Sequence, residues 1–92
     1  GAGTASEGGF VEYRVDLASL RRADVVPIGF IDIRPCTTLQ EVRTIITEEL
    51  DSLPNDFVFT KAKVPVGIRQ EAKKQVHYVA TDDCVILIRE LA

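Results

Sequence analysis

The stretch TLQEVRTIITEEL at residues 38–50 constrains the fold more than any other part of the chain. Its apolar residues recur at steps of three and four, which places them on one face of an α-helix. They are Leu39, Val42, Ile46 and Leu50, with Ile45 widening the stripe. Thr38 and Glu41 have the spacing of a capping box, so the helix is predicted to begin at Thr38. Such a helix needs a large apolar surface to cover, because each buried Leu, Ile or Val contributes about 1.5–3 kcal/mol.

The segments around this helix have the patterns of β-strands. Residues 10–17 alternate between apolar and polar side chains, as in a half-buried strand. Residues 25–34 form a second predicted strand, and Pro27 favours an edge position for it because proline has no N–H to donate. Three further strands are expected at residues 56–60, within residues 61–68 and at residues 84–89. The last is almost continuously apolar, which favours a central position.

These elements predict an α+β fold in the order β-β-α-β-β-β, with a mixed four- to five-stranded sheet packed on one helix. The length of 92 residues suits one domain, expected at residues 10–92. Residues 1–9 have neither the basic nor the apolar region of a signal peptide, and we expect a disordered lead-in or a cloning remnant there.

Composition narrows the class of partner and the compartment. The net charge of −3 argues against nucleic acid or an anionic membrane as the main partner. No apolar run approaches the roughly 20 residues of a membrane span. Cys36 and Cys84 are too few for a disulfide scaffold and predict separate thiols in a reducing compartment. We therefore expect an intracellular, cytoplasmic protein.

No group of residues has the pattern of a catalytic or metal site. His77 is the only histidine, and we expect it in the polar stretch and loop of residues 69–80. One histidine and two distant cysteines do not have the spacing of a zinc site. The glycines form no phosphate-binding loop, and no hydrolase motif surrounds either cysteine. We expect a protein that is not an enzyme and needs no metal or cofactor.

Two segments resemble ubiquitin-like domains. The run IDIRPCTTLQEVRTIITEEL, which begins at Ile31, is similar to the second strand and helix of that family. The run DDCVILIREL near the end of the chain is similar to the family's last strand, and LPND lies where the family has a proline-containing turn. The resemblance covers about residues 10–91 and implies a β-grasp fold. It implies little about function, because many unrelated activities use this fold.

The chain departs from ubiquitin itself in three ways. It ends at Leu91-Ala92 without a Gly-Gly pair, so we do not expect a conjugated modifier. The connection between the first two strands is longer, as in Ras-association and Ras-binding domains. Residues 61–80 match poorly.

Strand alternation predicts an apolar patch on the sheet face opposite the helix. If Val85 and Leu87 point toward the helix, then Ile86 and Ile88 point away, as do Phe30 and Val58. An exposed apolar patch rimmed by charge marks a partner site, and partners of the family commonly bind this face. We therefore expect a protein-interaction module of a larger protein. The residues expected to bind the partner are Phe30, Arg34, Val58, Ile86 and Ile88.

Two alternatives remain open. The edge strand at residues 25–34 is able to extend the sheet of a partner, and the resemblance to Ras-association domains implies a small GTPase there. The basic residues expected to face the GTPase are Arg14, Arg21, Arg22, Arg34 and Arg43. In the second alternative the apolar face is structural or joins two copies in a homodimer.

Overall fold

The computed structural model describes residues 9–91, and its elements follow the predicted order with two short additions. The strands are β1 (Val11–Ala18), β2 (Val25–Ile33), β3 (Phe57–Lys61), β4 (Val64–Pro65) and β5 (Val85–Glu90). The helices are α2 (Leu39–Glu49), α3 (Ile68–Glu71) and the 3-10 helix η1 (Val76–Tyr78). The last two replace the loop predicted there. The expectation for residues 1–9 lies outside the described residues, except at Gly9, which belongs to no helix or strand.

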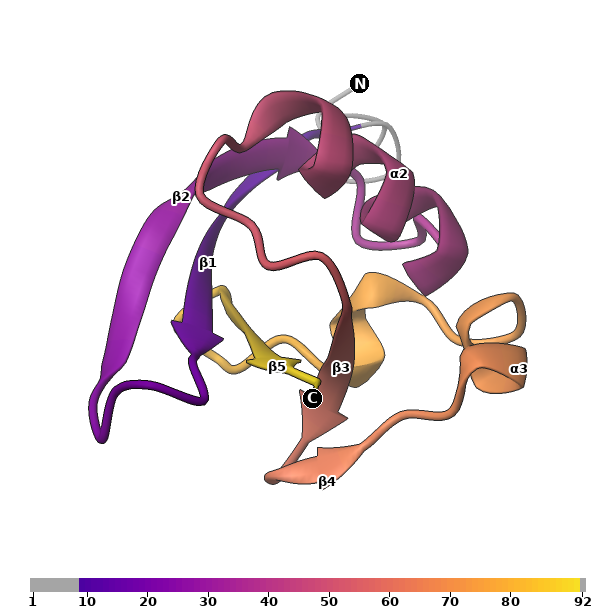
Figure 1. Cartoon of the computed structure of the whole chain (residues 1–92). Helices are drawn as coiled ribbons and strands as arrows, with labels where there is room; N and C mark the ends of the chain where they lie inside the picture. Colours follow the sequence, from indigo (N-terminus) through magenta and orange to yellow (C-terminus); the bar gives the residue numbers. More distant parts are fainter. Residues whose placement is uncertain (1–8, 92) are drawn as a thin grey trace.

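The five strands form one mixed sheet in the order β2-β1-β5-β3-β4 (Figure 1). β1 and β5 are parallel, and the other neighbours are antiparallel. The predictions of a central β5 and an edge β2 are confirmed. An apolar strand suits a position between two neighbours, and Pro27 suits an edge because it donates no hydrogen bond.

α2 packs its predicted apolar stripe on the sheet. Leu39, Val42 and Ile46 are fully buried in the same core as the inward side chains of the strands. Thr38 is the N-cap, and its hydroxyl oxygen accepts a hydrogen bond from the Glu41 N–H at 3.3 Å. The same hydroxyl donates to Glu41 Oε1 at 3.0 Å. The Glu41 carboxylate therefore returns to the hydroxyl, not to the backbone N–H as in a regular capping box.

The core contradicts the predicted orientation of β5. In the parallel register with β1, Ile86 lies opposite Val15 and Ile88 lies opposite Leu17. Both isoleucines are fully buried in the core. The prediction that Ile86 and Ile88 point away from the helix is therefore wrong.

The sequence of β5 explains this error. One phase of the strand contains Val85, Leu87 and Arg89, and the other contains Ile86, Ile88 and Glu90. Each phase has two aliphatic side chains and one charge, so alternation does not select the inward phase. Pairing with β1 selects it, and the first set lies half-buried on the other face of the sheet.

Gly29 allows the end of α2 to approach β2. The register between β1 and β2 shifts here, because Pro27 and Gly29 both find partners on β1 and Ile28 is the extra residue of a bulge. A Cβ atom at Gly29 would collide with Cδ2 of Leu50, the residue that ends α2. The missing side chain therefore makes room for Leu50.

Among the described residues, no helix is long and apolar enough to cross a membrane.

Candidate interaction surfaces

The sheet face that α2 does not cover is the first candidate surface, and we call it the open face. The strand register shows which side chains of neighbouring strands lie opposite each other on this face. Arg14 lies opposite both Phe30 and Val85, and Asp16 lies opposite Leu87. Val58 lies opposite Arg89 on the far side of β5. The open face therefore contains the half-buried aliphatic residues Val58, Val85 and Leu87 and the phenyl ring of Phe30, which is 57% exposed.

The central charges of the open face are already engaged within the molecule. Arg14 Nε and Nη2 donate to the two carboxylate oxygens of Asp16 at 2.8 and 3.0 Å. This hydrogen bond and the charge of Asp16 raise the pKa of Arg14. Arg89 Nη2 donates to the Lys63 carbonyl at 2.8 Å. An apolar strip between engaged charges is a composition that suits a protein contact.

The structure brings together only part of the predicted partner-binding set. Phe30 and Arg34 are exposed, and Val58 lies half-buried on the open face. Ile86 and Ile88 belong to the core instead. The positions expected for them on the open face belong to Val85 and Leu87.

Phe10 is a further exposed residue, absent from the predicted partner-binding set. Its ring is 64% exposed, and the Arg34 guanidinium lies over it at 5.0 Å from the ring centroid. The signal was present in the strand pattern, since Phe10 shares the phase of Glu12 and not that of Val11.

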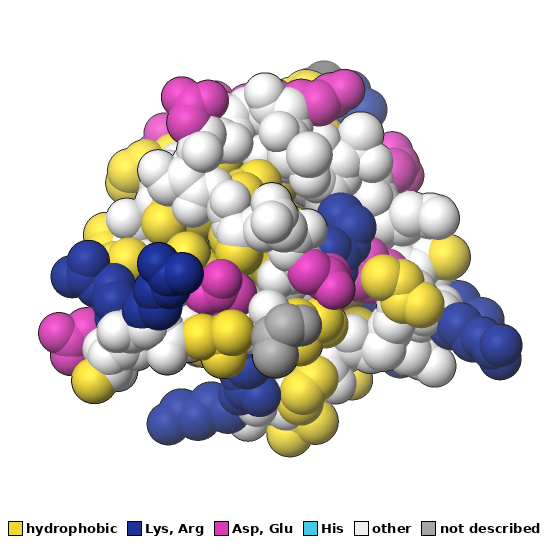
Figure 2. Space-filling view, in the orientation of Figure 1, with side chains coloured by type: hydrophobic (Ala, Val, Ile, Leu, Met, Phe, Trp, Pro, Cys, Tyr) yellow, Lys and Arg dark blue, Asp and Glu magenta, His cyan; other side chains and the backbone are white. Residues whose placement is uncertain are grey.

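The predicted basic edge is only partly assembled. Arg21 and Arg22 lie in the exposed connection between β1 and β2, and Arg34 follows β2 directly. Arg14 is occupied by its ion pair on the open face. The Arg43 guanidinium is bonded to Glu71 on α3 and to the Phe57 carbonyl on β3, away from β2, so its assignment to this edge is wrong. Figure 2 shows Lys and Arg side chains in separate groups, interrupted by acidic and apolar ones.

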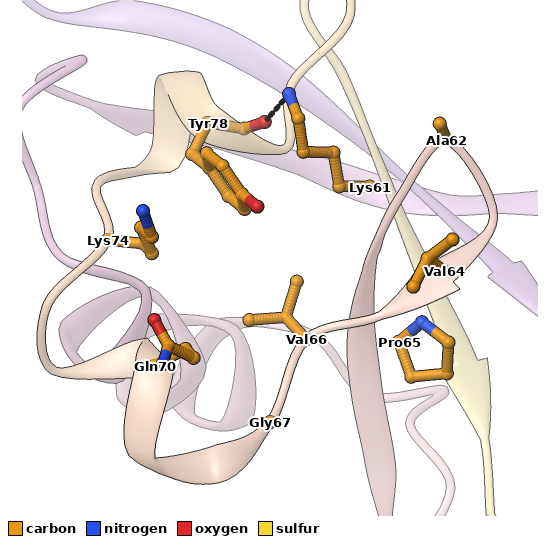
Figure 3. Close-up of a pocket in the computed structure, with 9 residues that line it drawn as sticks. All are labelled: Lys61, Ala62, Val64, Pro65, Val66, Gly67, Gln70, Lys74 and Tyr78. Carbon is orange, nitrogen blue, oxygen red and sulfur yellow. Dashed lines mark hydrogen bonds between the residues drawn. The ribbon is translucent and has the colours of Figure 1, made fainter.

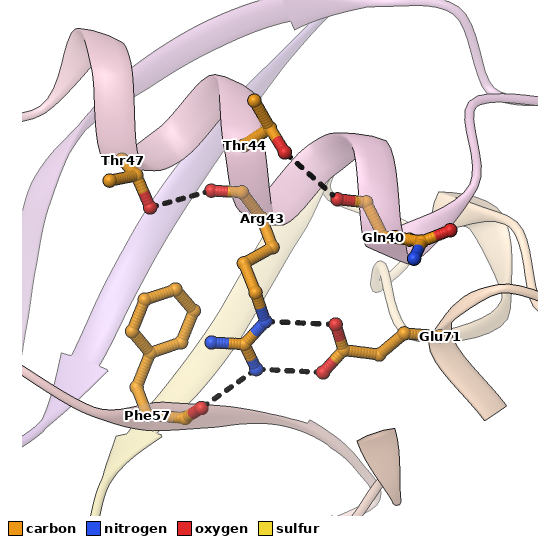
Figure 4. A network of polar contacts seen from close by, with 6 residues as sticks. All are labelled: Gln40, Arg43, Thr44, Thr47, Phe57 and Glu71. Carbon is orange, nitrogen blue, oxygen red and sulfur yellow. Dashed lines mark hydrogen bonds and ion pairs between the residues drawn. The ribbon is translucent and has the colours of Figure 1, made fainter. Parts of the chain in front are cut away.

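Arg43 holds three elements together (Figure 4). Its Nε and Nη2 donate to the two carboxylate oxygens of Glu71 on α3 at 2.8 and 2.7 Å. Nη2 also donates to the Phe57 carbonyl at 2.8 Å, and the guanidinium lies 4.3 Å from the centroid of the Phe57 ring. Glu71 is only 2% exposed. This bidentate pair joins α2, α3 and β3, and its role is structural.

A pocket of about 470 Å³ is the second candidate surface (Figure 3). It lies between the β3–β4 hairpin, α3 and η1. The residues around it include Lys61, Val64, Pro65, Val66, Lys74 and Tyr78. We call it the lysine pocket. Residues 61–68 were expected to form a turn and a short strand and residues 69–80 a polar stretch and loop, so the pocket was not predicted, although the clustering of lysines was a visible signal.

The remaining reactive side chains are dispersed. His77 is exposed in η1, with its Nε2 at 2.6 Å from Gln75 Oε1. Cys36 is exposed, Cys84 is half-buried, and both are free thiols. Within residues 9–91, no three or more His, Cys, Asp or Glu side chains gather where they would hold a metal ion.

Comparison with protein-family models, with curated proteins and with solved structures gave no match. What this domain binds must therefore be inferred from the chemistry of the open face and the lysine pocket.

Proposed function

We propose that this chain is a ubiquitin-like β-grasp domain that acts as a non-catalytic protein-interaction module. The element order and the mixed sheet on one long helix support the β-grasp assignment, because the resemblance of the sequence implies both. The partner is a protein that presents aliphatic side chains to the open face.

One observation carries this proposal, namely the apolar strip on the open face. Val85 and Leu87 are two residues apart on β5, and Val58 lies on the neighbouring strand opposite Arg89; all three keep part of their surface in water. Phe30 on β2 lies across Arg14 from Val85 and continues the strip. Covering such surface stabilises a complex by about 25 cal/mol per Å² of apolar area. The Arg14–Asp16 ion pair lowers the cost of covering the charges beside the strip, because both already have a partner.

The test compares what the wild-type domain and charged variants capture from a cell extract by quantitative mass spectrometry. Leu87→Asp and Phe30→Asp place a carboxylate within the strip. Thr47→Asp makes the same charge change at an exposed position of α2, on the other side of the molecule, and is the matched control. We expect the same partner to be retained by Thr47→Asp and reduced about tenfold or more by both strip variants.

Thermal unfolding of each variant separates binding from folding. Phe30 is 57% exposed, so Phe30→Asp should leave the melting temperature nearly unchanged even where Leu87→Asp lowers it. If every partner captured by the wild type is also captured by Phe30→Asp and Leu87→Asp, the open face is not the binding site.

A second candidate function is binding of a small GTPase along β2. Its edge position favours this function, because an edge strand offers unpaired backbone groups to a partner's sheet. Arg21, Arg22 and Arg34 remain on that side of the molecule. Arg34→Glu should then weaken binding to the GTP-bound form, and equal affinity for the GTP- and GDP-bound forms would exclude this function.

Self-association through the open face is a further outcome that one measurement resolves. Sedimentation at rising protein concentration gives the mass in solution. A homodimer predicts an increase that Leu87→Asp abolishes, and a monomer at every concentration excludes it.

A further inference from the structure

Positive charge is concentrated at one end of an otherwise acidic protein. All four lysines of the chain lie between residues 61 and 74, although the net charge is −3. The only acidic residue in that stretch is Glu71, which is buried and paired with Arg43. In residues 9–91, neither of the two ion pairs contains a lysine. The lysines therefore create a local positive field, and none of them is paired directly with a carboxylate in the described residues.

Two of these lysines are held against one aromatic ring. Lys61 Nζ lies 4.4 Å and Lys74 Nζ lies 4.6 Å from the centroid of Tyr78. Figure 3 shows them on either side of the Tyr78 side chain at the lysine pocket. Lys61 Nζ also donates to the Tyr78 carbonyl at 2.9 Å. These contacts orient both ammonium groups before any ligand arrives, and carboxylates beside them would offset their positive charge.

Part of the pocket lining is apolar. Val64 and Pro65 belong to it, and Val64 is 64% exposed. Val66 also lines the pocket and is buried. A ligand that fits this pocket therefore combines negative charge with an apolar group.

We propose that the lysine pocket is a second binding site, which takes an acidic peptide segment of a partner protein with an apolar residue next to its carboxylates. The carboxylates face Lys61 and Lys74, and the apolar side chain contacts Val64 and Pro65. Pro65 has no N–H, so regular strand pairing at β4 is blocked and side chains provide the recognition.

A peptide suits the pocket better than other anions do. No arginine lines it to bind a phosphate with a bidentate fork, and a lone phosphate would leave the apolar walls uncovered. A nucleic acid would extend beyond the pocket over a protein whose overall net charge is −3. Lys61 shares the strand phase of Phe57 and Phe59, so the pocket opens on the helix side of the sheet, away from the open face. Both surfaces can be occupied at once.

The experiment begins with the whole chain and a randomised peptide library displayed on phage. The expected result is that enriched peptides contain Asp or Glu beside Leu, Ile, Val, Phe or Trp. The most enriched peptide is then synthesised with a fluorescent label, and its affinity is measured by anisotropy. Lys74→Glu should weaken binding about tenfold or more. Lys73→Glu makes the same charge change one residue away, outside the pocket lining, and should weaken binding about twofold or less.

Two further variants make the result independent of folding and of the open face. Lys74→Met keeps the aliphatic stem of the side chain, so it should retain the melting temperature and lower the affinity for the peptide. Leu87→Asp should leave peptide affinity unchanged, so failure of the open face and failure of the lysine pocket are distinguishable.

Several outcomes would overturn the proposal. Enriched peptides that lack acidic residues, or a selection that enriches none, exclude an acidic peptide as the ligand. Equal losses in Lys73→Glu and Lys74→Glu indicate general charge attraction without a site. Displacement of the peptide by inorganic phosphate or by a single-stranded oligonucleotide at equal concentration assigns the pocket to a different class of anion.

Discussion

The β1–β2 hairpin and the segment between β4 and β5 each contain a carboxylate paired with arginine, but the two pairs differ in what they hold. Arg14 and Asp16 lie two residues apart on one strand, and the Arg14 side chain is 44% exposed. Arg43 and Glu71 lie 28 residues apart, with side chains that are 23% and 2% exposed. The first pair lies within one strand, and the second connects three elements, α2, α3 and β3.

This difference follows from how the backbone of each region is held. β1 and β2 pair along their whole length, so backbone hydrogen bonds fix the hairpin. Between β4 and β5 the chain forms no named strand, and its backbone reaches α2 through bonds such as Leu39 N–H to the Lys74 carbonyl at 2.9 Å. A region with few strand hydrogen bonds depends on side-chain anchors. An arginine–carboxylate pair therefore contributes most to stability in the region that lacks strand hydrogen bonds.

The largest expected effect comes from removing the buried anchor. Glu71→Ala leaves the half-buried Arg43 without its carboxylate, and we expect the free energy of unfolding to fall by about 2–4 kcal/mol. The value lies toward the lower end for a buried pair, because Arg43 is 23% exposed and keeps its bond to the Phe57 carbonyl. Urea unfolding measures the loss.

A double variant separates charge from packing at the same place. Arg43→Met with Glu71→Leu removes both charges and retains apolar volume, so it should recover most of the stability lost in Glu71→Ala. A loss below about 1 kcal/mol in Glu71→Ala would remove the basis for treating this pair as an anchor.

Gly29→Ala tests whether packing, and not an ion pair, stabilises the β1–β2 hairpin. The new Cβ collides with Leu50, and we expect a loss of about 1–3 kcal/mol from overpacking. Leu50→Ala should remove most of the added cost of Gly29→Ala in a double-mutant cycle. Additive losses would show that the backbone at Gly29, and not the collision, limits substitution.

The turn between β3 and β4 offers a smaller effect of opposite sign. Ala62 and Lys63 have φ of 50° and 70°, which are left-handed values that Asn-Gly adopts more easily in a two-residue hairpin turn. Ala62→Asn with Lys63→Gly should stabilise the domain by about 1 kcal/mol or less, because glycine also gains freedom in the unfolded chain. Thermal unfolding with Lys63→Ala as the control separates relief of strain from loss of charge.

The regions also differ in how far the sequence predicts them. Apolar spacing was sufficient for α2, and Pro27 and the apolar run of β5 were sufficient for the edge and the centre of the sheet. α3 was missed because its four residues have no periodic pattern, and it is anchored by a residue 28 positions earlier. Arg43 looked like any polar residue of an amphipathic helix, because its partner is distant in sequence. Of the five predicted partner-binding residues, Phe30, Arg34 and Val58 lie at the surface and Ile86 and Ile88 do not, because the inward phase of β5 depends on pairing with β1.

The smallest expected effect is in the Arg14–Asp16 pair of the hairpin, in which the Asp16 side chain is 13% exposed. Asp16→Ala removes the carboxylate, but Arg14 is 44% exposed and water replaces the lost partner. We expect a melting temperature within experimental error of the wild type, and no change in its dependence on salt. Thr47→Ala, at an exposed position of α2, is the control for a surface truncation. If Asp16→Ala destabilises the domain as much as Glu71→Ala does, then a continuous strand ladder does not make a side-chain pair dispensable, and the contrast between the two regions fails.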